Sequence, residues 1–384
     1  MNDWSRLARS LDGRITSCGE VGFQVGGQPH IRRTDPLTGA KVLVNPARKD
    51  RPRPGPDGCP YCAGATPPTL SYVRGQDRAG DMVVEAEEQT LRLGRALQRE
   101  GASDPYALVH ALGEKERVGA ERYTGPLVFP GEPWLARTFL NLVPTIISPG
   151  SAANCFVVGV TPGFHAADLG VTLEDGCDGM VLPDAVPEAI VASWTLLEEW
   201  SEYRGLLSVP FVNGGKGRES GQSIRCFHAQ FYSLNPQDEP PIYSWLREER
   251  AQGRCPVCTA FADEQLRIHT IGSVDIFMHP APARNLSMLL APRRETARLR
   301  DLDDPGAFAR AIQWAVRAYE RLLGGVPAYN VVVRTGSSVG HLHAEVIPRS
   351  YVNIPAGFEG ASGFRVVSAD PHVEAERLRG LLRE

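Results

Sequence analysis

Two short stretches with polar residues at alternating positions guide the interpretation of the whole chain: Cys226-Phe227-His228-Ala229-Gln230-Phe231 and His341-Leu342-His343-Ala344-Glu345-Val346. Successive side chains of a β-strand point to opposite faces of the sheet, so each stretch has one polar and one apolar face. The polar faces carry metal-ligand and nucleophile types: Cys226, His228 and Gln230, then His341, His343 and Glu345. The residues between them are expected in the core. We therefore expect each half of the chain to end on a strand that holds a functional site.

The segments around these two strands follow the same order in both halves. In the first half, the patterns predict strands at 137–143 and 155–160, a helix at 184–203, and strands at 206–212 and 226–234. In the second half, they predict strands at 268–278 and 286–291, a helix at 304–323, strands at 329–334 and 342–348, and a closing helix at 372–382. This order indicates an α+β protein. We divide it into domains 1–240 and 241–384.

The N-terminal part of the chain has weaker patterns. Residues 1–58 are expected to be irregular apart from one short strand at 41–44. Residues 83–101 are expected to form a helix, because Leu91, Leu93 and Leu97 recur among charged residues.

Composition excludes several classes of protein. The chain has 384 residues, 42% of them hydrophobic, which is ordinary for a globular protein. Its formal net charge of −4 argues against a protein that coats nucleic acid through charge. It lacks an apolar run of about 18 residues, so we expect no membrane span. The N-terminus also lacks the apolar core of a signal peptide, which predicts a cytoplasmic location.

Four of the 8 cysteines form two closely spaced pairs, Cys59-Pro60-Tyr61-Cys62 and Cys255-Pro256-Val257-Cys258. In a reducing compartment such pairs are more typical of metal sites than of disulfides. A thioredoxin-like redox pair is the alternative, but that motif follows a strand and opens a helix. The first pair instead follows a loop rich in proline and glycine at 53–58, whereas the second leads into a helical turn. The spacing therefore favours zinc, more clearly at the first pair.

Motifs along most of the chain resemble the galactose-1-phosphate uridylyltransferase class of the histidine triad superfamily, which includes nucleoside-diphosphate-sugar and dinucleoside-polyphosphate phosphorylases. The matching segments are 35–39, 42–48, 59–64, 141–144, 161–165, 221–230, 341–349 and 356–360. The resemblance implies two histidine-triad-like halves, each an antiparallel sheet with a long helix. It also implies a homodimer. Residues 73–134 depart most from the family.

The resemblance assigns His228 as the nucleophile that attacks the α-phosphorus of a nucleotide donor and forms a covalent nucleotidyl-histidine. Imidazole suits this role because it is both a good nucleophile near pH 7 and a good leaving group. Gln230 can donate a hydrogen bond to the phosphoryl oxygens, and Ser223 can help to cradle a phosphate. Further substrate-binding residues are expected at Asn141, Asn213, Lys216 and Gly221.

The resemblance also implies a zinc site made by Cys59, Cys62, His165 and Cys226. Cys226 stands where the family usually has histidine, and thiolate and imidazole are interchangeable zinc ligands. A reactive thiol at Cys226 is the alternative. A second site would use Cys255, Cys258, His341 and Glu295, with His279 and His343 as alternative ligands.

These observations predict a nucleotidyltransferase that moves a nucleoside monophosphate from a nucleoside-diphosphate sugar, or a similar pyrophosphate, to a phosphorylated acceptor. The first alternative is a phosphorylase or hydrolase of dinucleoside polyphosphates or nucleotide sugars. The second is a zinc-stapled binding protein that has lost the chemistry. His343 is the alternative nucleophile, although the second strand of duplicated relatives is usually non-catalytic.

Overall fold

The computed structural model describes residues 3–26, 31–36, 40–45, 69–76, 82–86, 135–141, 154–160, 184–215, 219–222, 227–325, 327–349 and 357–381. The chain forms two compact units. The first contains Met1–His165, Ala192–Ser208 and Ser223–Glu239, and the second contains Ala166–Val191, Val209–Gln222 and Pro240–Glu384. The division into domains 1–240 and 241–384 stays a prediction. The units themselves interleave along the chain, which passes between them within α4 (Ala185–Tyr203) and β7 (Leu207–Gly214).

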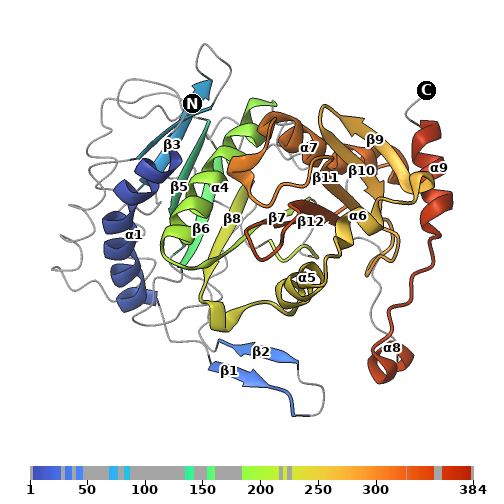
Figure 1. Cartoon of the computed structure of the whole chain (residues 1–384), viewed down its shortest axis with the longest axis horizontal. Coiled ribbons are helices and arrows are strands. Elements are labelled where there is room, and N and C mark those ends of the chain that lie inside the picture. Colours follow the sequence, from blue (N-terminus) through green and yellow to red (C-terminus); the bar gives the residue numbers. More distant parts are fainter. Residues whose placement is uncertain are drawn as a thin grey trace. The chain divides into compact units, whose positions relative to one another are not determined.

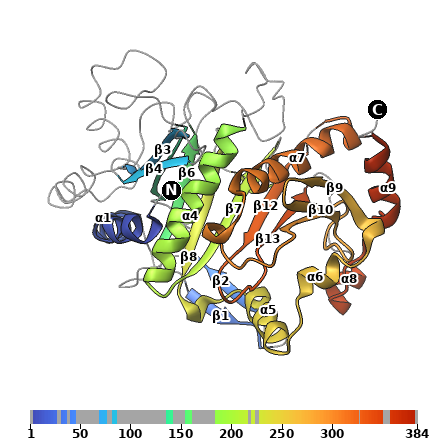
Figure 2. The same cartoon turned by 45° about the horizontal axis from the view of Figure 1, so that its top comes forward.

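The first unit is built on an antiparallel sheet with the strand order β4-β3-β5-β6-β8. These strands are β3 (Thr69–Gln76), β4 (Met82–Ala86), β5 (Ala136–Leu140), β6 (Asn154–Val160) and β8 (His228–Leu234). The Phe156 ring lies edge-on to Trp200, with ring centroids 5.5 Å apart, and it also contacts Phe231. The end of α4 therefore covers the apolar face of β6 and β8 (Figure 2).

Helix α1 (Trp4–Gly26) contradicts the prediction of an irregular N-terminus. Ala8, Leu11 and Ile15 of this helix are fully buried, at a helical spacing that the sequence analysis overlooked. The Trp200 indole N–H of α4 donates a hydrogen bond to Asp12 of α1 at 3.0 Å. Tertiary packing thus stabilises a helix of low mean hydropathy.

Two further N-terminal predictions have different outcomes. The strand at 41–44 is confirmed as β2 (Lys41–Val44), which pairs with β1 (Ile31–Thr34) in a separate antiparallel hairpin. The helix predicted from residue 83 is wrong at its start, because β4 (Met82–Ala86) pairs there with β3. Its leucines lie outside the described residues.

The second unit has an antiparallel sheet with the strand order β7-β12-β13-β11-β10-β9. These strands are β9 (Arg267–Ile271), β10 (Val274–Met278), β11 (Met288–Pro292), β12 (Tyr329–Arg334), β13 (His343–Pro348) and β7. The segment predicted as one strand at 268–278 is a hairpin of β9 and β10, because Gly272 turns the chain with φ +55°. The other predicted strands of this half are confirmed.

Helix α7 (Pro305–Leu323) lies across one face of this sheet and contacts β9, β10, β11 and β13 (Figures 1 and 2). It begins where Asp304 accepts a hydrogen bond from the Ala307 N–H at 2.7 Å, with proline at the first helical position. It ends at Gly324, whose φ of +69° suits a residue without a Cβ. These signals explain why its bounds were predictable.

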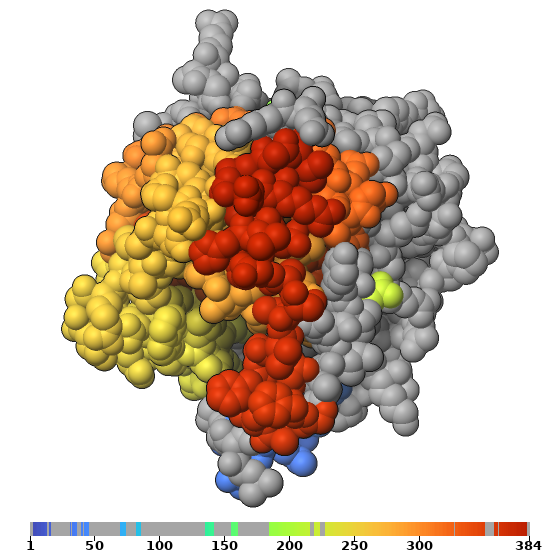
Figure 3. Space-filling model, turned by 90° about the vertical axis from the view of Figure 1, so that its right-hand side faces the viewer, coloured from blue at the N-terminus to red at the C-terminus, as the bar shows by residue number. Residues whose placement is uncertain are grey.

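The second unit also contains four shorter helices: α5 (Pro241–Ala251), α6 (Pro256–Ala260), α8 (Gly357–Ser362) and α9 (Pro371–Leu381). Helix α9 confirms the predicted closing helix and packs beside β9 and β10 (Figure 1). Figure 3 shows the C-terminal segment from α8 to α9 on the surface of the second unit. Among the described residues, no helix combines the length and the apolar character that a membrane span requires.

Candidate active-site strand and metal centre

Strand β8 begins at His228 and is held by pairing with β6. Phe227, Ala229 and Phe231 are at most 1% exposed, so the predicted apolar face is confirmed. His228 is 4% exposed and shares the opposite face with the half-buried Gln230. The ladder thus holds both side chains on a rigid element, which suits a site that must position a reacting atom.

The register of the first sheet adds an arginine to the face of His228. Gly159 of β6 lies opposite His228, and Arg137 of β5 lies opposite Gly159. Opposite residues of an antiparallel pair share a face, so these three residues form one row across the sheet. Glycine leaves the middle of this row without a side chain, and a Cβ there would lie 3.1 Å from the Phe139 ring.

Arg137 was missed by the sequence analysis. It is 5% exposed, and its guanidinium carbon lies 5.3 Å from the centroid of the Phe139 ring, within the range of a cation–π contact. Alternation along β5 places Arg137 and Phe139 on one face, which was a usable signal. The pairing of β5 with β6 and of β6 with β8 was needed to relate this face to His228.

The matching strand of the second unit is more enclosed. Leu342, Ala344 and Val346 are fully buried, which confirms its apolar face. His343 is 6% exposed, and its Nδ1 lies 2.8 Å from the His341 carbonyl oxygen. Burial, with the nearby charge of Arg334, lowers the pKa of His343 to about 3, so its imidazole is neutral near pH 7.

Cys255, Cys258 and His341 come together in the second unit as a candidate metal centre. Their three ligand atoms all lie within 4.8 Å of one another. The His341 Nδ1 lies 3.4 Å from the Cys255 Sγ and 3.5 Å from the Cys258 Sγ. A tetrahedral zinc ion, with bonds of about 2.3 Å to sulfur and about 2.0 Å to nitrogen, holds those atoms about 3.5 Å apart. The donor set and its spacing therefore fit a metal ion.

Local hydrogen bonds orient the side chains of this centre. Cys255 is the N-cap of α6, with Pro256 at the first helical position, and its Sγ accepts a hydrogen bond from the Cys258 N–H at 3.4 Å. The His341 Nε2 lies 2.8 Å from the Pro292 carbonyl oxygen at the end of β11. Since a carbonyl only accepts, Nε2 carries the proton and Nδ1 presents its lone pair to the sulfurs.

Cys258 and His341 both have shifted pKa values at this centre. Burial, with the nearby Cys255 and Glu295, raises the pKa of the Cys258 thiol to about 12. Burial also lowers the pKa of His341, which keeps its imidazole neutral. Since metals bind thiolate and neutral imidazole, a cation would release the Cys258 proton that the surrounding groups retain.

Glu295, predicted as the fourth ligand, is close enough to affect the pKa of Cys258 but does not belong to the group of three. Its Oε1 lies 2.7 Å from the Arg250 Nη1. Arg250 also packs against Gly340, where a Cβ would overlap its side chain. His279 and His343, the alternative ligands, also lie outside the group of three. The fourth ligand stays a prediction.

Three of the predicted substrate-binding residues, Asn141, Asn213 and Gly221, belong to the described part of the chain. Asn141 directly follows β5, and its Nδ2 donates to the Cys155 Sγ at 3.5 Å. Asn213 lies near the end of β7, where its Oδ1 accepts a hydrogen bond from Asn330. Gly221 has a φ of +83°, a conformation that favours glycine. Six predicted residues lie outside the described residues: Cys59, Cys62, His165, Lys216, Ser223 and Cys226.

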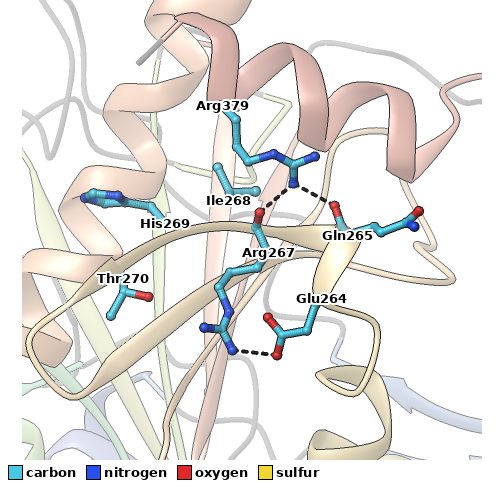
Figure 4. A pocket seen from close by; sticks show the side chains of 7 residues that line it. All are labelled: Glu264, Gln265, Arg267, Ile268, His269, Thr270 and Arg379. Atoms are coloured by element: carbon cyan, nitrogen blue, oxygen red, sulfur yellow. Dashed lines mark hydrogen bonds and ion pairs between the residues drawn. The ribbon is translucent and has the colours of Figure 1, made fainter. Parts of the chain in front are cut away.

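A surface hollow of about 390 Å³ lies between β9 and α9 in the second unit (Figure 4). Arg379 donates hydrogen bonds to the carbonyl oxygens of Gln265 and Arg267, both at 2.6 Å. The Arg267 guanidinium is paired with Glu264 at 2.8 Å. Arg379 thus holds α9 to the start of β9, and the Arg267 guanidinium is occupied by Glu264, so we assign the hollow no role in the chemistry.

No family model and no curated protein matches this chain. Among solved structures, a uridylyltransferase mutant matches with 18% identity and a TM-score of 0.61, covering 92% of this chain and 98% of its own. An ADP-glucose phosphorylase from Arabidopsis thaliana with bound ADP-glucose matches with 18% identity and a TM-score of 0.55 over the same shares. The chain has the uridylyltransferase fold.

A galt-like protein from Arabidopsis thaliana shares this fold, with 18% identity and a TM-score of 0.52 over 64% of this chain and 83% of its own. The resemblance found in the sequence is therefore confirmed for the fold, as is the α+β class with antiparallel sheets. At such low identity the uridylyltransferase fold does not transfer an activity to this chain.

Proposed function

We propose that this protein is a nucleotidyltransferase that works through a covalent nucleotidyl-histidine at His228. The observation that carries the proposal is the polar row on the first sheet of a uridylyltransferase fold. His228 shares this row with Arg137, and it shares its sheet face with Gln230 of the same strand. The ADP-glucose bound to the phosphorylase neighbour supports a nucleoside-diphosphate sugar as the donor.

The reaction has two steps. In the first, an imidazole nitrogen of His228 attacks the α-phosphorus of the donor, a P–N bond forms, and the α-P–O bond to the sugar phosphate breaks. The sugar 1-phosphate leaves with the electron pair of that bond. In the second step, an oxygen of a phosphorylated acceptor attacks the same phosphorus, the P–N bond breaks, and neutral His228 is restored.

Arg137 and Gln230 would stabilise the charge that develops on the phosphoryl oxygens. Gln230 donates hydrogen bonds without adding negative charge, and Arg137 supplies a positive charge in a site of low dielectric. The Phe139 ring packs beside Gly159, so Arg137 and His228 are the two polar side chains that this row presents. Arg137 and Gln230 would thus have separate tasks beside the nucleophile.

The metal would be zinc, held by Cys255, Cys258 and His341 in the second unit and by the predicted first site of Cys59, Cys62, His165 and Cys226. When bound, zinc would supply structural cross-linking rather than a reacting group. His341 would join the start of β13 to α6 through it. A homodimer and a cytoplasmic location remain predictions from the sequence.

A phosphorylase is the second candidate function, supported by the ADP-glucose phosphorylase that shares the fold. Its first step is the same, and inorganic phosphate replaces the sugar phosphate as acceptor. Hydrolysis would use water in the second step. The choice between these activities therefore depends on what removes the nucleotide from His228.

The test is the intact mass of the protein after incubation with UDP-sugars, ADP-sugars and dinucleoside polyphosphates, each alone. We expect a gain equal to one nucleoside monophosphate, which is absent in His228→Ala and retained in His343→Ala. Release of the adduct by sugar phosphate, by phosphate or by water then identifies the acceptor. Failure to modify or consume any donor would favour the non-catalytic binding protein, and an adduct lost only in His343→Ala would identify the other nucleophile.

A further inference from the structure

One side chain of the second unit holds two points of the glycine-rich turn that follows β7. Asn330 of β12 lies opposite Asn213 of β7 in the sheet register. Its Nδ2 donates one hydrogen bond to the Asn213 Oδ1 at 2.7 Å and one to the Ser220 carbonyl oxygen at 2.8 Å. Both N–H groups of this amide are thus used, and they join residues that lie seven positions apart in the chain.

Gly214, Gly215 and Glu219, which are described between these points, pack closely on residues of the second unit. A Cβ at Gly214 would overlap the Tyr329 side chain, and a Cβ at Gly215 would overlap the Pro327 carbonyl oxygen. The Arg349 Nε donates to the Glu219 carbonyl oxygen at 3.2 Å. The start of β12 therefore supports the described residues of the turn.

The bond from Asn330 also decides how the Asn213 amide is oriented. An asparagine amide has an acceptor oxygen on one side and an NH₂ group with two donors on the other. Because the oxygen of Asn213 accepts from Asn330, its NH₂ group is turned the opposite way. Phosphate oxygens accept hydrogen bonds, so this orientation is the one that can bind a phosphorylated donor.

We propose that Asn330 is a positioning residue for phosphate recognition: it fixes the Asn213 amide as a donor and anchors Ser220 of the same turn. The proposal rests on the nucleotidyltransferase function proposed above and goes beyond it, because Asn330 belongs to none of the motifs or sites assigned to that reaction. Asn330 acts through Asn213 and does not touch the reacting phosphorus.

The first test is Asn330→Asp, which keeps the size of the side chain and replaces its two donors with an acceptor. The Asn213 amide is then expected to turn over, donate to the introduced carboxylate and present its oxygen to the donor phosphates. The KM for the nucleotide donor should rise roughly 10- to 100-fold, the loss expected for a hydrogen bond to a charged group. The maximal rate of adduct formation should fall less than this.

A double-mutant cycle separates positioning from a general structural effect. Asn213→Ala, Asn330→Ala and the double variant are compared for KM and for the rate of adduct formation at saturating donor. If Asn330 acts through Asn213, the double variant should resemble the worse single variant, because residues that act as a unit are not additive. Fully additive losses would overturn the proposal.

Asn285→Asp is the matched control, since Asn285 is a buried amide of the same unit that binds Ser368 and Ala369. It should leave the KM for the donor unchanged. If Asn330→Asp loses its cooperative thermal transition, Asn213→Asp replaces it, because this variant keeps the bond from Asn330. It should show the same rise in KM, and a KM like that of the wild type would overturn the proposal.

The two proposals fail in different ways. If the wild-type protein forms no adduct with any donor, the nucleotidyltransferase function fails before Asn330 is tested. If the wild-type protein forms the adduct and folded Asn330→Asp has an unchanged KM, only the positioning role fails.

Discussion

At the scale of single residues, the proposed role of Arg137 can be tested directly by substitution. Its guanidinium is almost fully buried on the sheet face that carries His228. We predict that Arg137→Gln lowers the rate of adduct formation about 100-fold, because transition-state charge loses a donor in a low-dielectric site. Arg137→Lys should recover part of the rate, since it keeps the charge without the planar fork. Intact-protein mass spectrometry of samples quenched at fixed times measures both rates. Equal rates in all three proteins would assign Arg137 to packing alone.

His341 and Glu295 make separable predictions for the metal centre. His341→Ala should lose one metal ion per chain, because it removes one of three ligand atoms whose mutual distances fit a single metal ion. Glu295→Gln should weaken metal binding about tenfold if its carboxylate is the fourth ligand, and Arg250→Met should strengthen it by releasing that carboxylate. Metal content and chelator competition provide the readouts. Unchanged affinity in Glu295→Gln would assign the fourth position to another group.

At the scale of elements, helix α9 is held by groups that titrate. The His372 Nε2 lies 2.8 Å from Asp263 beside α6, and its Nδ1 lies 3.6 Å from Asp370. The hydrogen bond to Asp263 raises the pKa of His372, so the charged form stabilises the docked helix. At the other end, Arg379 binds the carbonyl oxygens of Gln265 and Arg267 (Figure 4).

A raised pKa fixes the sign of the pH dependence of α9 docking. The stabilisation is complete below the unfolded-state histidine pKa of about 6.5 and is lost as pH rises through the higher folded value. Hydrogen exchange in α9, corrected for its intrinsic pH dependence, should therefore show less protection at about pH 8.5 than at about pH 6. His372→Gln should remove this difference. Protection that rises with pH in the wild-type protein would contradict the prediction.

Elements also show what the sequence could and could not reveal. Alternation around His228 and His343 predicted both apolar faces, because a period of two depends only on the strand itself. Helix α7 was predictable from Asp304, Pro305 and Gly324, which act locally. The row of Arg137, Gly159 and His228 depends on pairing between distant strands, and the tautomer of His341 depends on the Pro292 carbonyl. Local patterns do not contain such long-range partners.

At the scale of the whole molecule, each unit has its own set of antiparallel strands and its own buried apolar residues. A metal held by Cys255, Cys258 and His341 lies entirely within the second unit, where it links α6 to the start of β13. A ligand that binds only the folded state stabilises it by mass action, by about 4 kcal/mol at a free concentration roughly 1,000 times Kd. Metal loss at this centre should therefore weaken the second unit first.

Calorimetry of the full chain tests this expectation. For a unit of this size, such a loss corresponds to a fall in Tm of roughly 8–16 °C. In the wild-type protein, a chelator should lower one thermal transition by this amount. The His341→Ala substitution alone should lower the same transition. Adding the chelator to His341→Ala should then cause no further change in that transition. His269→Gln, a histidine of the same unit outside the group of three, serves as the matched control. If chelation moves the same transition equally in His341→Ala and in the wild-type protein, the metal that stabilises the fold is bound elsewhere.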